Sequence, residues 1–532
     1  MADKREDGLR EGMSTSEDLI QLNTEDSSPD KNVEMTDKTD TDNEVGSEAD
    51  REAKPGIFKS FIDYFYGNFI VLVLGFVSLP VITRVLSTEE YGRTSLYSSV
   101  VSIIYIFAIL GLDQSYIRYY YKEGVSRRKL FRQCLSAPLV LIVVLAGIYA
   151  VFARPLNLLL FDRHGIDITL LVVAYTVTSV FERFLFLNIR MDQKGKLYSN
   201  LNILSKVLYI AFIFIFVYIL GDDFRVGLYA LTLPLVLVTL GIGIGYAVRI
   251  HGESMDDHKI STKELLKYGV PFVPMLLMEW LLSSMDKWSI KIFNDYAETG
   301  VYSAAMQIMT ILLTFKITYV AFWSPVAMEK YETGTEAEVK PFFADMFEKV
   351  QFLCMLAAFG LTAFRSIIVL ILGESYRGAI RIIPFLSLMP ILSILFEMTG
   401  QGIKFKGKVI YFNYASLAAI VCNLAGNTLL VPKYKGVGAA FATALTYIVY
   451  FAIGTYLANR CYPVQYKYGR FVTALVIYIG YSFYATLCGT EWVNIVLGIV
   501  LMVVLCALNA KTLTALWKLA SDALRSFKRN NQ

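Results

Sequence analysis

Five basic side chains lie inside apolar stretches or close to their ends, where charge is costly. They are Arg118, Arg183, Lys206, Lys316 and Arg365. An ionisable side chain that faces lipid costs at least ~2.5 kcal/mol, so such residues usually face a protein interior or a hydrated cavity. Fixed cations in that setting can bind an anionic group, and Arg adds bidentate donors. We therefore predict that these five residues bind an anionic substrate.

Most of these cations also have a structural explanation. Arg118, Lys206 and Arg365 lie near predicted segment ends, from which long side chains can extend to lipid headgroups. Arg183 follows Glu182 and can form an ion pair within the helix bundle. The binding and the structural explanations both stay open at this point.

Polar side chains follow one face of two consecutive apolar stretches. Glu279, Ser283 and Asp286 are spaced i, i+4 and i+7 on the first stretch, which places them on one helix face. The stripe on the second stretch consists of Ser303, Gln307, Thr310, Thr314 and Thr318. Lys316 lies roughly 140° around the helix from that second stripe. We expect both stripes to line a cavity, although polar stripes also hold transmembrane helices together.

Two buried carboxylates are candidates for coupling transport to an ion. Glu279 and Glu397 can take up a proton, because burial favours the protonated carboxyl group. A structural ion pair, for instance with Lys316, explains them equally well. Asn423 and Asn427 lie one helical turn apart, and we expect them to be interhelical hydrogen-bond partners rather than ligands.

The stretches that carry these residues indicate that lipid is their solvent. The chain has 532 residues, of which 55% are hydrophobic and 18% charged, whereas soluble proteins carry about a quarter charged residues. Apolar runs of about 20 residues recur, each long enough to cross a roughly 30 Å hydrocarbon core. We predict an all-α integral membrane protein with about fourteen transmembrane helices. The predicted spans are 62–83, 95–112, 134–153, 167–188, 200–220, 226–248, 269–290, 300–323, 350–371, 380–401, 408–430, 437–458, 471–488 and 492–510.

Lys and Arg residues are concentrated in alternate predicted loops. Six loops hold 22 of them, among them Arg127, Arg128 and Lys129, and the opposite loops hold roughly half as many. Because short cytoplasmic loops carry an excess of Lys and Arg, both termini are predicted to be cytoplasmic. The protein is accordingly placed in the cytoplasmic membrane.

The two ends of the chain differ from the membrane body. Residues 1–54 contain 7 basic and 17 acidic residues with few apolar ones, while the rest holds 43 basic and 29 acidic residues. The first segment is predicted to be a disordered cytosolic tail, since it cannot bury enough apolar surface to fold. Residues 511–532 combine an apolar stripe with basic residues, which is typical of an amphipathic helix on anionic lipids.

A weak internal repeat divides the body into two halves. The pattern E-x-G-x-x-S occurs at 90–95 and again at 298–303, in predicted turns after the first and seventh spans. Similar segments begin at Gly227 and Gly438, so the two offsets are 208 and 211 residues. We predict six-helix lobes at 55–248 and 249–458, followed by two extra helices at 459–510. Equal orientation of the lobes would create a central cavity, as in alternating-access transporters.

Metal and cofactor chemistry finds no support in the sequence. The six Cys residues are scattered without a CxxC pair, and the three His residues fall in predicted loops. That spacing excludes a disulfide framework and a thiolate zinc site. We expect no metal, no cofactor, no nucleic-acid partner and no enzymatic activity.

Several motifs resemble one known family. They are 79–92 (LPVITRVLSTEEYG), 111–118 (GLDQSYIR), 286–288 (DKW) with 300–305 (GVYSAA), 373–376 (GESY), and 423–427 with Pro432 and 436–440. Over about residues 60–460 the chain resembles the polysaccharide-biosynthesis flippases. These are the O-antigen and exopolysaccharide repeat-unit translocases of the multidrug/oligosaccharidyl-lipid/polysaccharide exporter superfamily. The acidic N-terminus is not part of the family pattern.

The resemblance implies a fourteen-helix, two-lobed fold. The implied function is to flip undecaprenyl-diphosphate-linked oligosaccharide to the outer leaflet for surface polysaccharide assembly. Implied partners are this lipid-linked substrate, membrane lipids, a coupling ion (H⁺ or Na⁺), and a polysaccharide polymerase or glycosyltransferases. A lipid II-type flippase and a cation-coupled multidrug antiporter are the alternatives. The antiporter is disfavoured because the basic body suits an anionic substrate better, and a membrane glycosyltransferase is disfavoured by the short loops.

Overall fold

The computed structural model describes residues 67, 69–122, 124–249, 260–487, 490–518 and 521. The chain divides into two units, Met1–Ile57 and Phe58–Gln532, and all described residues belong to the second. The predicted disordered tail at 1–54 lies outside the described residues, as does most of the tail at 511–532. Within the described ranges the regular secondary structure is helical, without a strand.

Twelve helical segments in the described ranges are long and apolar enough to cross a membrane. They are α2 (Thr88–Ile109), α4 (Arg127–Val151), α6 (Ile166–Met191), α7 (Gly195–Leu220), α8 (Arg225–Arg249), α9 to α10 (Thr262–Phe293), α11 (Tyr296–Thr333), α12 (Glu336–Ala363), α14 to α16 (Ile383–Phe405), α17 (Ile410–Cys461), α18 (Tyr468–Leu487) and α19 (Glu491–Leu508). A shorter apolar helix precedes them at Phe69–Val85. The chain is therefore a multi-pass membrane protein.

Short helices connect or interrupt these spans. They are α3 (Leu112–Tyr119), α5 (Ala153–Phe161), α9 (Thr262–Gly269), η3 (Val270–Phe272), α13 (Arg365–Val369), η4 (Glu374–Arg381), α14 (Ile383–Leu386) and α16 (Gln401–Phe405). The main helices of the two interrupted spans are α10 (Val273–Phe293) and α15 (Leu388–Thr399). Breaks of this kind leave backbone groups free of their helical partners, and membrane proteins tolerate them where protein or a cavity surrounds them.

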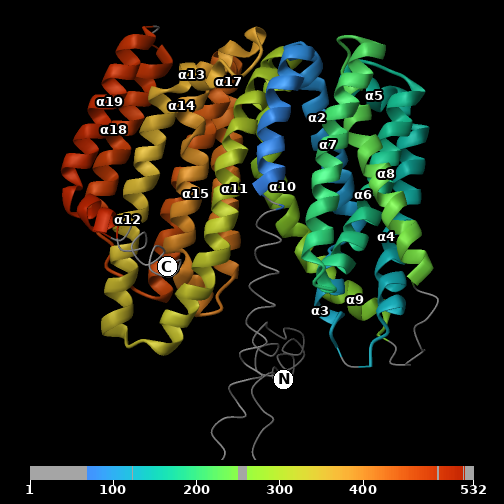
Figure 1. The fold of residues 1–532 in the computed structure, drawn as a ribbon, viewed down its shortest axis with the longest axis horizontal. Coiled ribbons are helices and arrows are strands. Elements are labelled where there is room, and N and C mark those ends of the chain that lie inside the picture. Colours follow the sequence, from blue (N-terminus) through green and yellow to red (C-terminus); the bar gives the residue numbers. More distant parts are fainter. Residues whose placement is uncertain are drawn as a thin grey trace, which may run out of the picture. The chain divides into compact units, whose positions relative to one another are not determined.

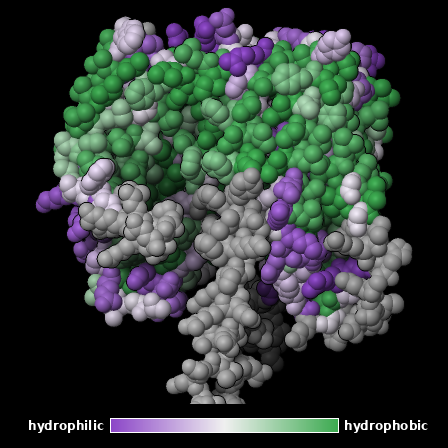
Figure 2. Space-filling model, viewed as in Figure 1, coloured by the Kyte–Doolittle hydropathy of each residue, from purple (hydrophilic) through white to green (hydrophobic). Residues whose placement is uncertain are grey.

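The surface agrees with a lipid environment. Figure 2 shows a broad hydrophobic band over the visible helices, with hydrophilic residues gathered at its two ends. Many large apolar side chains of the described helices are exposed, among them Val143, Leu170 and Ile317. In water such a surface would be an aggregation hazard, whereas in a bilayer it is the expected lipid contact.

The 52-residue α17 consists of two helices joined at a kink. Lys435 has φ 52° and ψ −134°, which is not helical, and Gly436 follows it. The kink agrees with the predicted division between 408–430 and 437–458, while two separate membrane crossings there stay a prediction. The total of about fourteen membrane crossings stays a prediction, because the helix at Phe69–Val85 is shorter than the others.

The two E-x-G-x-x-S motifs begin helices rather than forming turns. Ser87 precedes α2 and its side chain accepts a hydrogen bond from the Glu90 amide. Asp295 precedes α11 and accepts in the same way from the Glu298 amide. An N-cap of this type satisfies amide groups that the first helical turn leaves free. The prediction of turns at these motifs was wrong, but the repeat places both motifs at the same position in a helix.

The repeated glutamates also make equivalent contacts. Glu90 accepts a hydrogen bond from the Phe224 amide at 2.8 Å, next to the start of α8. Glu298 accepts from the Gly436 amide at 3.1 Å, at the kink of α17. Each carboxylate thus ties the helix that it opens to the start of a helix far along the chain.

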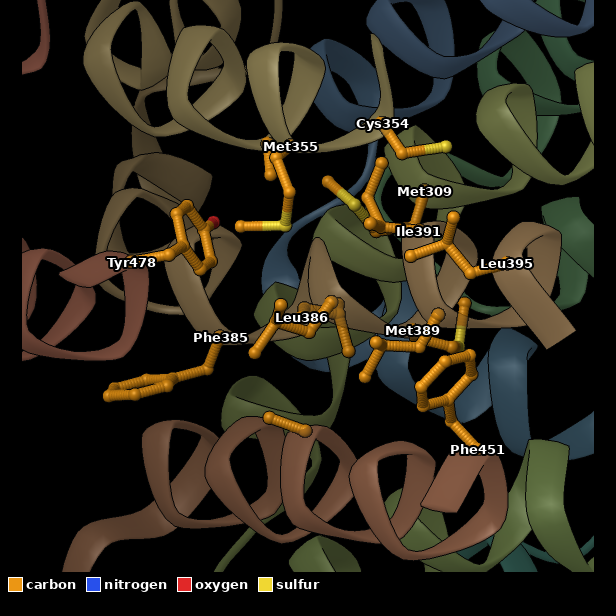
Figure 3. Packing of buried hydrophobic residues seen from close by; sticks show 14 of the residues in the cluster. Met309, Cys354, Met355, Phe385, Leu386, Met389, Ile391, Leu395, Phe451 and Tyr478 are labelled. Atoms are coloured by element: carbon orange, nitrogen blue, oxygen red, sulfur yellow. The ribbon is translucent and has the colours of Figure 1, made fainter. Parts of the chain in front are cut away.

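Helices α10 and α11 pack against both earlier and later helices of the chain. Figure 1 shows the helices running side by side, with α10 and α11 between the earlier helices and α12 to α19. α10 packs against α2 and α17, and α11 packs against α2 and α15. The largest core cluster draws, apart from Leu79, on residues between Ile290 and Leu505. Its close packing around Met355, Leu386 and Tyr478 is visible in Figure 3.

Candidate functional site: a charged cavity between the helices

A cavity of about 970 Å³ lies among helices that come from early and late segments of the described chain. Its walls come from Phe69–Val85, α2, α6, α7 and α8 on one side and from α10, α11, α15, α16 and α17 on the other. The charged residues among its described lining are Glu182, Lys206, Glu279, Lys287, Lys316, Glu397 and Lys404. Lysine is therefore the cationic residue of the cavity wall.

Three of these residues form a compact ion-pair cluster. The Lys316 Nζ lies 3.3 Å from Glu397 Oε1, and the Lys404 Nζ lies 3.2 Å from Glu397 Oε2. Lys316 also donates a hydrogen bond to the Ser393 hydroxyl at 3.0 Å. α11, α15 and α16 each contribute one charged residue, so the cluster holds one carboxylate between two ammonium groups.

The other two lysines have no carboxylate partner within 4 Å among the described residues. The Lys206 Nζ lies 4.4 Å from the centre of the Tyr209 ring, in a cation–π contact on α7. Lys287 lies on α10, next in sequence to the buried Asp286, without an ion pair. Lys206 and Lys287 thus present positive charge to the cavity from its two sides.

Most of the predicted polar stripe residues line this cavity. Glu279 and Ser283 are exposed to it on α10, and Gln307 and Thr310 line it from α11. Ser283 and Thr310 use their hydroxyl groups to donate to carbonyl groups of their own helices. Thr314 is not among the lining residues. Its hydroxyl donates to the Thr310 carbonyl at 3.1 Å.

Asp286 departs from the predicted stripe. It is completely buried, and its carboxylate accepts hydrogen bonds from Asn423 at 3.0 Å and Asn427 at 2.7 Å. Tyr302 and Thr443 donate to its second oxygen, each at 2.5 Å. The interhelical role predicted for Asn423 and Asn427 is confirmed. The lining stripe of α10 instead continues from Ser283 to Lys287, one residue beyond the i+7 position.

Lys316 reaches the cavity despite its predicted angle to the stripe of α11. It lines the cavity together with Thr310 and Leu313, although it lies far around the helix from Ser303. Steps of three residues each rotate the lining face by about 60°. The lining face therefore turns along the 38-residue α11 and reaches Lys316.

The three predicted arginines lie outside the cavity lining. Arg183 Nη2 lies 2.7 Å from Asp113 Oδ2 on α3, rather than pairing with its neighbour Glu182. The Arg118 guanidinium lies 4.9 Å from the centre of the Tyr268 ring.

Arg365 is 1% exposed, and its Nη2 lies 2.9 Å from Glu491 Oε1 at the start of α19. Asn494 of α19 donates to the Thr362 carbonyl nearby. Arg365 therefore holds α19 against the end of α12.

Glycine contacts join the two sides of the cavity at one end of α2. A Cβ on Gly92 would lie 2.0 Å from the Tyr296 carbonyl oxygen, and one on Gly300 would lie 1.9 Å from that of Thr88. The two glycines of the repeat therefore let the beginnings of α2 and α11 touch backbone to backbone. Tyr376 of η4 donates to the Leu86 carbonyl at 2.9 Å in the same region.

A second junction lies at the other end of α2. A Cβ on Gly111 would lie 2.2 Å from the carbonyl oxygen of Gly269, which ends α9. The Ser115 hydroxyl donates to the Leu265 carbonyl at 2.7 Å, and the Tyr119 hydroxyl donates to Glu264 at 3.1 Å. The cavity thus lies between two junctions that connect earlier and later helices.

The chain is similar to known proteins of one family. Residues 57–329 match the family model described as polysaccharide biosynthesis protein, which is more than half of the chain. The chain belongs to this family. The resemblance inferred from the motifs is confirmed. A Haloferax volcanii protein described as "Probable low-salt glycan biosynthesis flippase Agl15" is 21% identical over 413 residues, covering 77% of this chain and 85% of the relative.

Two solved structures share the fold. The lipid II flippase MurJ in an inward closed conformation has a TM-score of 0.62 and 12% identity, covering 86% of this chain and 100% of MurJ. An inward-facing multidrug resistance MATE family transporter of the MOP superfamily has a TM-score of 0.57 and 18% identity, covering 74% and 96%. The predicted class of all-α transporter fold is thereby confirmed.

Three charged lining residues escaped the list drawn from the sequence. Glu182 was considered only as a partner for Arg183, and Lys404 was not singled out. Lys287 was part of the Asp-Lys-Trp motif but was not recognised as a lining residue. The i, i+4, i+8 series of Glu279, Ser283 and Lys287 is the sequence signal that identifies it.

Proposed function

We propose that the chain flips an undecaprenyl-diphosphate-linked oligosaccharide across the cytoplasmic membrane for surface polysaccharide assembly. Membership of the polysaccharide biosynthesis family and the description of the Haloferax relative as a glycan biosynthesis flippase support this substrate class. The lipid chain would stay in the bilayer while the charged headgroup and sugars pass through the cavity. The protein's work is then to solvate the headgroup, and no covalent step is needed.

One observation carries the proposal, namely the lysines of the cavity wall. A diphosphate that leaves water needs cations that replace its hydration, and Lys206 and Lys287 are cavity lysines without a carboxylate partner among the described residues. Lys316 is a third cation within the same cavity. We propose Lys206, Lys287 and Lys316 as headgroup ligands. Arg118, Arg183 and Arg365 are left out because their contacts lie elsewhere.

The polar lining suits the sugars. Ser283, Gln307 and Thr310 offer hydroxyl and amide groups on adjoining helices, and such groups form hydrogen bonds with sugar hydroxyls. Glu279 faces the cavity and has no ion pair among the residues that the structure describes, and we propose that it takes up the coupling ion, H⁺ or Na⁺. Loading and release would alternate as the junctions at the two ends of α2 open in turn.

Charge favours this function over that of a multidrug antiporter. A multidrug antiporter for cations would meet four cavity lysines against three glutamates, which disfavours a cationic substrate. A lipid II-type flippase fits the same lysines, because its substrate also carries a diphosphate. The two differ in the sugars and not in the headgroup site.

Export assays on neutral variants test the proposal. Lys206→Gln and Lys287→Gln should abolish surface polysaccharide export in cells that depend on this chain, while protein abundance stays near normal. Abundance should hold because neither lysine leaves an unpaired carboxylate behind. Lys196→Gln is the matched control, since Lys196 is an exposed residue on the same helix as Lys206. Normal export by both variants would refute the headgroup site.

A further inference from the structure

Glu397 uses both of its carboxylate oxygens on lysines that point into the cavity. Oε1 faces Lys316 at 3.3 Å and Oε2 faces Lys404 at 3.2 Å. The side chains are 20% exposed for Glu397, 26% for Lys316 and 32% for Lys404. The cluster therefore lies on the cavity wall, where it is partly hydrated and open to exchange.

The arrangement is that of an anion held between two ammonium groups. A substrate phosphate also presents two or more oxygens to neighbouring cations and could occupy the same place. Lysine suits such an exchange, because its ammonium is a compact charge on a flexible stem and forms no fixed fork. Arginines, by contrast, are absent from the described cavity lining.

A purely structural role for this cluster is weakly supported. Partly exposed ion pairs contribute little to stability. α15 also packs against α11 and α17 through the apolar residues of the largest core cluster. Glu397 is thus not needed to attach its helix.

We propose that Glu397 is an internal counter-anion, which occupies the place of one substrate phosphate between Lys316 and Lys404 and gives way when the headgroup binds. This inference rests on the proposed function and deepens it. Lys206 and Lys287 would capture the diphosphate first, and Lys316 and Lys404 would join by exchanging Glu397 for a phosphate. On release, Glu397 returns to the two lysines and displaces the headgroup.

The exchange solves a problem that a transporter of a multiply charged anion faces. Four unpaired lysines in a cavity would hold a diphosphate too tightly for it to leave, and transport requires that binding be weak enough for release. Glu397 competes with the substrate for Lys316 and Lys404. The apparent affinity for the diphosphate is then the intrinsic affinity multiplied by the fraction of molecules in which these lysines are free.

Binding of inorganic pyrophosphate to the purified full-length protein tests the inference. In isothermal titration calorimetry, Glu397→Gln should bind pyrophosphate about tenfold more tightly than the wild type if the lysines are free in about a tenth of wild-type molecules. Glu182→Gln is the matched control, because it removes a cavity carboxylate that has no ion pair among the described residues and no role in the proposed transport. Equal tightening by both variants would reduce the effect to general cavity charge and overturn the inference.

A second pair of variants guards against misfolding of Glu397→Gln, which leaves two like charges side by side. Glu397→Gln with Lys404→Gln keeps the net charge and still frees Lys316. Adding Lys316→Gln should weaken pyrophosphate binding more in that background than in the wild type, and equal weakening would contradict the exchange.

The outcomes separate the two proposals. Wild-type binding that Glu397→Gln leaves unchanged overturns the counter-anion alone. No binding to either protein overturns both the counter-anion and the headgroup site.

Discussion

The ion pair of Arg183 with Asp113 offers a test of whether Arg183 has a structural role or binds the substrate. The Asp113 side chain is 6% exposed, and the Arg183 Nε and Nη2 both donate to its Oδ2. Removing Arg183 leaves the buried Asp113 carboxylate without its ion-pair partner, although the Gln114 amide still donates to it at 3.0 Å. Because the Arg183 side chain is 38% exposed, the cost stays below the ~3–5 kcal/mol of a fully buried pair.

We expect Arg183→Gln to lower protein abundance and thermal stability in detergent, with export falling in proportion. Arg190→Gln on the same helix is the control, because Arg190 is exposed and has no ion pair among the described residues. Combining Arg183→Gln with Asp113→Asn should recover part of the stability, since both charges are then gone. A stable Arg183→Gln protein that fails to export would instead return Arg183 to the substrate site.

The sequence pointed to most ionisable residues of the membrane region, and it named Lys316 as a partner for Glu397, which the structure shows. It did not identify the partner of Arg183. Glu182 was the natural partner for Arg183 by proximity, yet Asp113 on α3 is the actual one. The choice depends on how neighbouring helices are rotated, and a single sequence does not specify that rotation. Asp286 illustrates the same limit, because one residue of helix phase separates the cavity face at Lys287 from the buried network around Asn427.

At the scale of elements, α2 and α11 meet through the two glycines of the repeat. A side chain on Gly300 would collide with the Thr88 carbonyl oxygen at 1.9 Å, and backbone atoms cannot move aside as a flexible side chain can. The contact therefore tolerates only glycine as long as this end of the cavity is closed.

We expect Gly300→Ala to prevent closure at this junction and to abolish export. A cysteine placed at Ser303 in a cysteine-free background should then react more readily with a membrane-impermeant reagent added from outside. Gly241→Ala on α8 is the control, because no atom lies within 4 Å of a Cβ built there. Unchanged labelling of the cysteine at position 303 would show that the junction is not a gate.

The repeat pointed to these helices but not to their contact. Spacing revealed that Gly92 and Gly300 occupy equivalent positions, and the structure adds that the two positions touch. A repeat gives the internal correspondence of two segments, whereas their meeting depends on how the segments dock. Helix starts were also misplaced by several residues, since Ser87 and Asp295 were not recognised as N-caps.

At the scale of the whole molecule, orientation in the membrane stays a prediction from the bias of basic residues. Val125 lies in a loop rich in basic residues and Thr490 in a loop on the opposite predicted side. A cysteine introduced at Thr490 should react with an impermeant reagent in intact cells. One at Val125 should react only after permeabilisation, and the reverse result would invert the proposed topology.

Fold class and family were predictable because they depend on features that are visible in the sequence itself. Apolar runs of membrane-spanning length gave the helices, and motifs such as 79–92 gave the family. The cavity was less predictable, since its lining combines helices that lie far apart in the sequence. Lys404 is an example. In the sequence it lies near the predicted end of a span, and only the structure shows that it shares Glu397 with Lys316 of α11.

The central claim is that this chain moves a diphosphate-linked oligosaccharide by means of its cavity lysines. The most direct test is a flipping assay in proteoliposomes, with an undecaprenyl-diphosphate-linked oligosaccharide that carries a radiolabel and a probe that reaches only the outer leaflet. We predict that the wild-type protein and Lys196→Gln bring labelled lipid to the probe, and that the double variant Lys206→Gln with Lys287→Gln does not exceed protein-free liposomes. Equal flipping by the double variant, or none by the wild type, would contradict the account.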